Sequence, residues 1–203
     1  MTLKISELEA LSIYGLKNLT KLKIESFDFS STDFYWVVFR EDMTKKGVAP
    51  TNLGVGSLQD EWEWLQDIFD DEQIAVTMDF NYLGSLTRTI SYLISNGLFS
   101  SKASNQQFNK PVRVAKIQDL YEAIFKSILE CRIEEVAVEH NFYWVLDIED
   151  SYCFEKIPKP RQRKLTDDMK FLREQMKNKK MDHDTLALFF ERLGSVIRLA
   201  DFL

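Results

Sequence analysis

The chain has 203 residues, of which 45% are hydrophobic and 13% aromatic, and its formal net charge is −6. With only 7 Gly and 4 Pro, this composition excludes a disordered chain and a loop-rich all-β protein. The negative charge argues against nucleic-acid binding by the chain as a whole. No run of about 18 apolar residues occurs, so we expect no membrane-spanning helix.

The first expected elements are a helix and two strands. A Ser-x-x-Glu capping box predicts a helix over residues 6–19 that is interrupted or ended near Gly15. Alternation of apolar and polar residues predicts a strand over 21–29. Consecutive aromatic and β-branched residues over 34–40 predict a second strand, buried on both faces. We expect these two strands to form an antiparallel hairpin.

Two helices follow a loop that is expected over 41–56. Ser57 is expected to cap a helix that extends to about Phe69, and a second helix begins near Asp79 or Asn81 and stops at residues 96–97. Apolar residues at helical spacing predict the side chains that face the core. These are Leu58, Trp62, Leu65, Ile68, Leu83, Leu86, Ile90 and Leu93.

A five-residue aromatic segment occurs twice. Phe-Tyr-Trp-Val-Val at 34–38 returns as Phe-Tyr-Trp-Val-Leu at 142–146, and 142 − 34 = 108. The match extends, at the same offset, to the pattern F-Y-W-V-[V/L]-x-x-E-D-x7-P over 34–50 and 142–158. A repeat of such rare residues in one order indicates an internal tandem duplication.

Two further segments support the duplication. After the loss of one residue, 58–65 matches 165–172 at an offset of 107. Upstream, 4–8 matches 116–120 at an offset of 112, which implies that the second copy lost about four residues before its aromatic strand. The copies are expected to be two halves, residues 1–97 and 112–203, and the polar segment 98–111 is the expected linker.

The second half repeats the predicted order of the first. Helix 117–130 is followed by strands 133–139 and 142–148, by helix 165–177 and by a last helix from Asp184. Each half is therefore α-β-β-α-α, and the predicted fold class is α+β. Two strands are too few for a stable isolated sheet. We expect the hairpins to join into one four-stranded sheet, or to pack face to face, across a pseudo-dyad.

The inward faces of these last two helices follow from helical spacing as well. The expected core residues are Leu165, Met169, Leu172, Met176, Leu186, Phe189, Leu193, Val196, Ile197 and Ala200.

No common enzyme motif occurs: GxSxG, GxxxxGK[ST], GxGxxG, HExxH and paired CxxC are all absent. We expect no cofactor. His140 is expected at the surface of a turn, and His183 is expected to cap a helix. Cys131 and Cys153 have no metal-type spacing, which favours reduced thiols in a cytoplasmic protein. The N-terminal residues lack the basic and apolar regions of a secretory signal.

The repeated acidic pairs are a candidate metal site. Glu41-Asp42 and Glu149-Asp150 follow corresponding strands, and carboxylate oxygens are natural ligands of divalent cations. The competing interpretation is that these residues serve the turn that follows a strand.

The two halves differ sharply in charge. Residues 60–79 contain eight acidic and no basic residues, whereas 156–180 contains ten basic and three acidic ones. The difference has three possible explanations: solvated faces that diverged, attraction between the two faces, or binding of a partner of opposite charge. Trp64 is expected to point sideways among the carboxylates if Trp62 packs inward, unless it seals the contact between the halves.

These observations favour a non-enzymatic protein-binding protein, most concretely a bacterial immunity-type protein that neutralises a toxin. The partner is expected to be a basic protein. The alternatives are a metal-dependent or hydrolytic enzyme that uses the repeated Glu-Asp pairs, and RNA binding through 156–180. The expected partner-binding residues are Asp60, Glu61, Glu63, Trp64, Asp67, Asp70 and Asp71.

Overall fold

The computed structural model describes residues 1–29, 33–67, 76–101, 111–138 and 140–200. Helices and antiparallel strands make up this part of the chain, which confirms the α+β fold class. The helices are α1 (Ile5–Lys21), α2 (Arg40–Met43), α3 (Leu58–Asp67), α4 (Val76–Ser95), α5 (Val114–Glu130), α6 (Ile148–Ser151), α7 (Leu165–Gln175) and α8 (His183–Leu199). The strands are β1 (Thr2–Lys4), β2 (Ile24–Asp28), β3 (Phe34–Val38), β4 (Leu53–Ser57), β5 (Phe99–Ser101), β6 (Pro111–Arg113), β7 (Glu135–Ala137), β8 (Phe142–Val145) and β9 (Arg161–Lys164).

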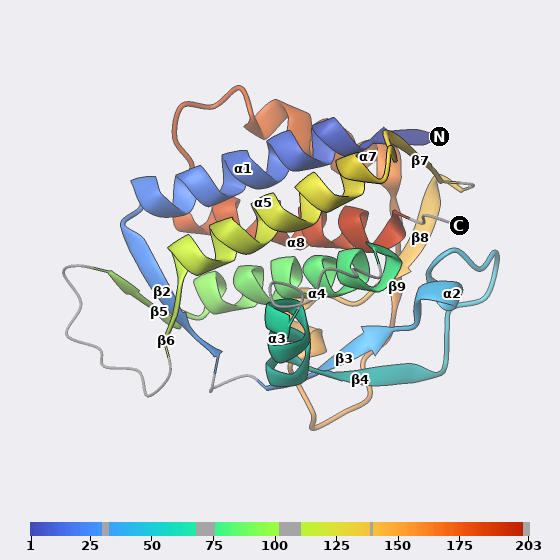
Figure 1. Ribbon diagram of the computed structural model, residues 1–203. Coiled ribbons are helices and arrows are strands. Elements are labelled where there is room, and N and C mark those ends of the chain that lie inside the picture. The colour runs from blue at the N-terminus through green and yellow to red at the C-terminus, as the bar shows by residue number, and fades with distance from the viewer. Residues whose placement is uncertain (30–32, 68–75, 102–110, 139, 201–203) are drawn as a thin grey trace.

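Helices α4 and α8 pack against each other in the middle of the molecule, and α1 and α5 lie side by side above them (Figure 1). The crossing of α4 and α8 brings Gly84 and Gly194 together. A Cβ on Gly194 would lie 2.5 Å from the carbonyl oxygen of Gly84. The two backbones therefore touch, and only glycine allows this approach.

The same order of elements occurs twice along the chain. The series β1-α1-β2-β3-α2-β4-α3-α4 is followed, after β5, by β6-α5-β7-β8-α6-β9-α7-α8. A duplication would produce this order, but a duplication event itself stays an interpretation. The boundaries 1–97, 98–111 and 112–203 stay predictions too. The ends of the predicted linker contain β5 and β6, which both pair with β2.

The sequence offset that aligns the first helix of one half, α1, with that of the other half, α5, differs from the predicted offset. Buried positions of α1, such as Ile5 and Leu8, recur in α5 as Val114 and Ile117, so the offset is 114 − 5 = 109. Each helix is followed by a residue with positive φ, Lys23 (62°) and Arg132 (59°), again 132 − 23 = 109 residues apart. The predicted offset of 112 is wrong by almost one helical turn. The second half is shorter by one residue before its aromatic strand, not by about four.

The strand pairing also corrects the prediction. The predicted hairpins, 21–29 with 34–40 and 133–139 with 142–148, do not form, and no four-stranded sheet joins them within the described residues. β3 pairs with β4 and β8 with β9, while β1 pairs with β7 and β2 lies between β5 and β6. The first strand of each half thus pairs with the second strand of the other half.

β4 lies inside the segment 41–56 that was predicted to be a loop. Its sequence, Leu-Gly-Val-Gly-Ser, carries no strand signal because glycine weakens a strand. In the sheet, however, Tyr35 lies opposite Gly56, where an added Cβ would come within 2.5 Å of the tyrosine ring. The aromatic ring fills the space that the glycine leaves.

Several helix ends differ from the prediction as well. The N-cap of α1 is Lys4 without a side-chain hydrogen bond, so the predicted capping box does not form. Gly15 does not interrupt α1, and it packs where an added Cβ would lie 3.0 Å from the ring of Phe190. α4 begins at Val76 and α5 at Val114, each three residues or more before the predicted start. The predicted cap at Ser57 is confirmed, since its Oγ accepts a hydrogen bond from the backbone N–H of Asp60 at 3.1 Å.

One hydrophobic core contains residues of both halves. The described side chains that helical spacing placed inward are buried, with one exception: Met176 is 37% exposed, because α7 ends at Gln175. Ile68 lies outside the described residues. The periodicity therefore predicted the core well, although it did not predict how the strands pair.

Candidate functional site

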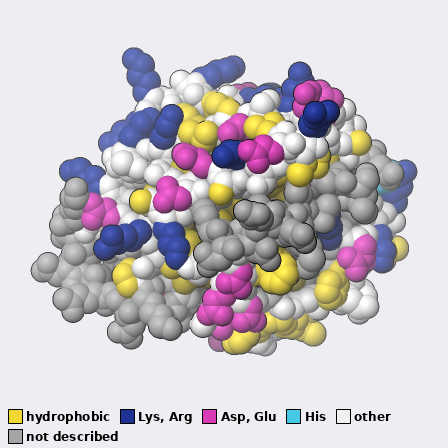
Figure 2. Space-filling view, viewed as in Figure 1, with side chains coloured by type: hydrophobic (Ala, Val, Ile, Leu, Met, Phe, Trp, Pro, Cys, Tyr) yellow, Lys and Arg dark blue, Asp and Glu magenta, His cyan; other side chains and the backbone are white. Residues whose placement is uncertain are grey.

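An acidic and aromatic face of α3 lies at the surface. Asp60, Glu63, Trp64 and Asp67 are all exposed, and their spacing places them on one side of the helix. Figure 2 shows acidic side chains gathered over α3, with hydrophobic side chains beside them over the β3–β4 hairpin. We call these four residues the α3 face.

Trp64 is the aromatic member of the α3 face, with 45% of its surface exposed. Its ring meets the ring of Tyr82 on α4 at a centroid distance of 6.1 Å. Trp62, in contrast, is buried, packs edge-on against Phe29 at 5.4 Å and lies under the Nζ of Lys116. The prediction that Trp62 packs inward is confirmed, and Trp64, which was expected to point sideways among the carboxylates, is about half exposed.

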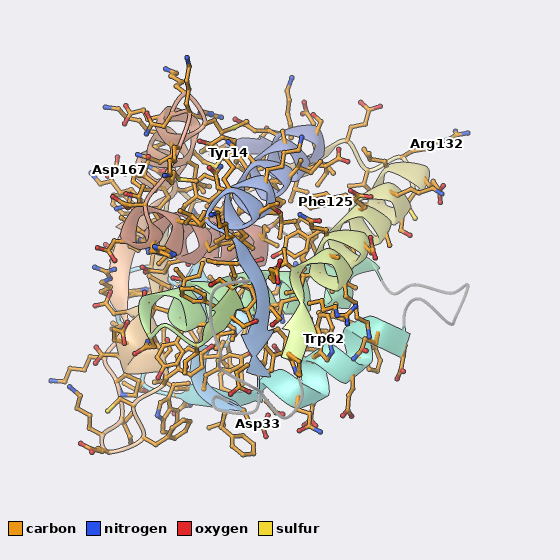
Figure 3. The ribbon with its side chains drawn as sticks, turned by 90° about the vertical axis from the view of Figure 1, so that its left-hand side faces the viewer. Tyr14, Asp33, Trp62, Phe125, Arg132 and Asp167 are labelled. Atoms are coloured by element: carbon orange, nitrogen blue, oxygen red, sulfur yellow. The ribbon has the colours of Figure 1, made fainter. Side chains whose placement is uncertain are left out.

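Local hydrogen bonds fix the beginning of α3. Asp33 accepts hydrogen bonds from the Ser57 hydroxyl at 2.8 Å and from the backbone N–H of Gln59 at 3.1 Å. Figure 3 shows Asp33 beside this end of the helix. Phe34 and Val55, on the adjoining hairpin, are 57% and 54% exposed. The α3 face therefore continues onto an apolar patch of the β3–β4 hairpin.

Glu61 does not belong to this exposed face. It accepts a hydrogen bond from the Tyr35 hydroxyl, and its Oε2 is buried without a hydrogen-bond partner among the described residues. Burial raises the pKa of the Glu61 carboxyl to about 7, although the Tyr35 hydrogen bond and the charge of Arg198 oppose the rise. A partner bound to the α3 face would not reach this carboxylate. The predicted residues Asp70 and Asp71 lie outside the described residues.

Four of the ten basic residues of 156–180 form ion pairs within the protein. Arg163 binds both Asp168 at 2.7 Å and Glu191 at 2.8 Å, and its side chain is only 9% exposed. Further ion pairs join Lys156 to Asp150, Arg161 to Asp147 and Arg173 to Glu7. These contacts leave fewer cations for a nucleic acid.

The acidic helix α3 and the basic helix α7 do not face each other. α3 lies at the bottom and α7 at the top of both Figure 1 and Figure 3, where Asp167 of α7 is far from Asp33. Attraction between α3 and α7 therefore does not account for the opposite charge of these two helices.

The repeated acidic pairs lie in the short helices α2 and α6. Asp42 is buried and forms an ion pair with Lys45, and Asp150 lies 3.7 Å from the Nζ of Lys156. Within the described part of the chain, no group of three or more His, Cys, Asp or Glu side chains has an arrangement that could hold a metal ion. The structure thus does not bring Glu41 and Glu149 into such a group.

The two histidines and the two cysteines are the remaining candidate residues. His140 is partly exposed in the turn before β8. His183 does not cap α8: Asp182 does, by accepting a hydrogen bond from the Thr185 N–H at 2.8 Å, while His183 stacks on Phe99. Cys131 and Cys153 are free thiols.

Sequence analysis missed two buried arginines, Arg88 of α4 and Arg198 of α8. They are 7% and 6% exposed, and each donates a hydrogen bond to the last residues of an aromatic segment, at Leu146 and Val38 respectively. A signal existed, because each arginine is the single charged residue in an otherwise uncharged stretch of its helix, 80–95 and 193–199.

Comparisons with protein-family models, curated proteins and solved structures found no match. Among the described helices, none has both the length and the apolar character that a bilayer crossing requires. The function is therefore argued from the surface of this chain.

Proposed function

We propose that this chain is a non-enzymatic, cytoplasmic protein that binds a basic protein through the α3 face. The observation that carries the proposal is the exposed ring of Trp64, surrounded on one side of α3 by Asp60, Glu63 and Asp67. Tryptophan is enriched among the residues that dominate binding energy. Surrounding carboxylates speed and orient the approach of a basic partner.

The neighbouring patch extends the surface in one direction. Phe34 and Val55 are more exposed than Trp64 and lie on the hairpin that leads into α3. A partner that covers both the patch and the α3 face would bury apolar area in its centre and charges at its rim, as stable interfaces do.

The most concrete form of this proposal is a bacterial immunity-type protein that neutralises a toxin. A small acidic chain rich in aromatic residues and lacking the common catalytic motifs fits that class. Free thiols at Cys131 and Cys153 fit a reducing compartment.

The two alternatives have less support. RNA binding would need free cations in 156–180, whereas Arg163 is buried in ion pairs. A metal-dependent or hydrolytic enzyme would use Glu41, Asp42, Glu149 and Asp150. It predicts that calcium, magnesium or manganese raises the melting temperature, because a ligand of the native state stabilises it.

The test is capture of a partner from a lysate of the source cells by the immobilised protein, at low and then moderate salt. We expect one stoichiometric basic polypeptide. It should be lost with the triple variant Asp60→Lys/Glu63→Lys/Asp67→Lys, and Trp64→Ala should weaken binding at least tenfold, by about 2 kcal/mol. Circular dichroism should show that both variants remain folded.

The second half offers a matched control. Asp167 and Glu174 on α7 correspond to Asp60 and Asp67 at the offset of 107, and both are exposed. Asp167→Lys/Glu174→Lys should therefore retain the partner. Equal capture by the triple variant, or a partner that is nucleic acid, would contradict the proposal.

A further inference from the structure

A small pocket lies where β3 and the segment after β8 meet α4 and α8. Its volume is about 10 Å³, which is room for one particle of about the size of a water molecule. Among the described residues that line it, two are arginines and none is acidic. The polar lining consists of Tyr35, Trp36, Ser85, Arg88, Ser151, Tyr152 and Arg198.

The positive charge at this pocket has no direct counter-ion among the described residues. Arg88 donates to the Ser195 hydroxyl at 2.6 Å and to the Leu146 carbonyl at 2.7 Å. Arg198 donates to the Val38 carbonyl at 2.8 Å and to the Asn81 side chain at 3.3 Å. Arg88 also donates to the Ser151 hydroxyl at 3.4 Å, and all of these acceptors are neutral.

The nearest carboxylates bind other groups, although the Oε2 of Glu61 has no hydrogen-bond partner among the described residues. Glu191 binds Arg163 at 2.8 Å, and Glu61 accepts the hydrogen bond of Tyr35. Burial lowers the pKa of both pocket arginines, to about 10 for Arg198, and the charge of Arg88 adds to the fall at Arg198. Two cations therefore repel each other in a site where water screens them weakly.

A second observation concerns a hydrogen-bond donor without an acceptor. The indole Nε1 of Trp36 is buried and has no hydrogen-bond partner among the described residues. At the corresponding position in the second half, Trp144 donates its Nε1–H to the Lys45 carbonyl at 2.8 Å. A buried donor without an acceptor is costly, so the pocket at Trp36 favours a ligand that accepts hydrogen bonds.

We propose that this pocket binds a small monovalent inorganic anion, for which chloride is the probe. Such an ion offsets the charge of Arg88 and Arg198 and accepts the indole N–H of Trp36. The volume of the pocket excludes phosphate esters, nucleotides and carboxylic acids of metabolic size. The site is independent of the α3 face, so it stands whether or not that face binds a protein.

The test is thermal unfolding of the full chain while sodium chloride replaces sodium gluconate at constant ionic strength. The melting temperature should rise with chloride and then saturate, as expected for one site on the native state. Trp36→Phe keeps an aromatic ring and removes the N–H. It should weaken chloride binding by about tenfold, as expected for one hydrogen bond to a charged group.

Trp144→Phe is the matched control, because the N–H of Trp144 is bound elsewhere, and it should leave chloride binding unchanged. Crystals soaked in bromide should show an anomalous peak between Arg88 and Arg198. A melting temperature that does not respond to chloride, an equal response of Trp36→Phe and the wild type, or water alone in the bromide crystals would each overturn the proposal.

Discussion

A buried tyrosine–carboxylate pair occurs once in each half, with different surroundings. Tyr35 and Glu61 correspond to Tyr143 and Asp168, at offsets of 108 and 107, and in both pairs the phenol donates to the carboxylate. Asp168 also binds Arg163 at 2.7 Å and lies 3.3 Å from the guanidinium of Arg192.

Glu61 lacks both of those cations. The position of Arg163 is taken by Gly56 (163 − 107 = 56), and that of Arg192 by Tyr82 (192 − 110 = 82), where the offset of 110 is set by Gly84 and Gly194. With a tyrosine beside it but neither of these cations, the Glu61 carboxyl has a pKa that burial raises to about 7. The comparison teaches that the backbone of a half places the carboxyl, whereas side chains on neighbouring elements decide whether arginines bind it.

The largest expected effect is at Asp168. Asp168→Asn removes the negative charge between Arg163 and Arg192 and leaves the buried Arg163 with Glu191 alone as its ion-pair partner among the described residues. We expect a loss of about 3–5 kcal/mol in the free energy of unfolding, measured by urea denaturation at pH 7. Asp167→Asn, on the exposed side of the same helix, should change it by less than about 0.5 kcal/mol. Similar losses in the two variants would show that the ion network does not stabilise the second half.

At Glu61, in contrast to Asp168, we expect the negative charge of the carboxylate to destabilise the folded protein. The folded pKa is about 7 against an ordinary value of 4.5. The native state thus retains a proton that the unfolded chain has lost, and stability falls as the pH rises from about 4.5 through about 7. The full effect is about 3 kcal/mol.

Glu61→Gln should remove this pH dependence and should be the more stable protein at pH 8, by up to about 3 kcal/mol. Urea denaturation at pH 5 and pH 8 measures both effects. Glu63→Gln, at an exposed position of the same helix, should keep the pH dependence of the free energy of unfolding that the wild type has. A slope that is unchanged in Glu61→Gln would show that another group titrates.

The smallest expected effect compares two aromatic residues. Phe171 corresponds to Trp64, but it is partly buried under the guanidinium of Arg192, whose Cζ lies 4.2 Å from the ring centroid. Phe171→Ala should cost about 2 kcal/mol of stability through lost packing and a lost cation–π contact. Trp64→Ala should cost about 1 kcal/mol or less. Thermal unfolding of the two variants checks the order, and the reverse order would argue that Trp64 is structural.

Helical periodicity predicted most of the core because each helix buries one continuous face. It also contained the signal for Glu61, which lies three residues after Leu58 and four before Leu65 and so shares their buried side. Glu61 was predicted to bind a partner because it was grouped with its acidic neighbours by charge, and its helical spacing was not considered.

Strand pairing could not be read from the sequence in the same way. The β4 sequence depends on Tyr35 for its side-chain packing, and that partner is about twenty residues away along the chain. The site at Arg88 and Arg198 depends on two helices that only the folded chain brings together. Local patterns contain no information on such contacts.

The exchange of strands between the halves has a consequence for how the chain folds during synthesis. β1 pairs with β7, joining Thr2 to Ala137 across 137 − 2 = 135 residues, and β2 pairs with β6. When the first hundred residues have left the ribosome, Leu3 still lacks Val136 and Phe27 still lacks Val112. Contacts between residues so distant in sequence form slowly, and unpaired strands invite aggregation meanwhile. The first half therefore cannot form all of its strand pairs before the second half is synthesised. The chain completes its fold only after most of it has been made.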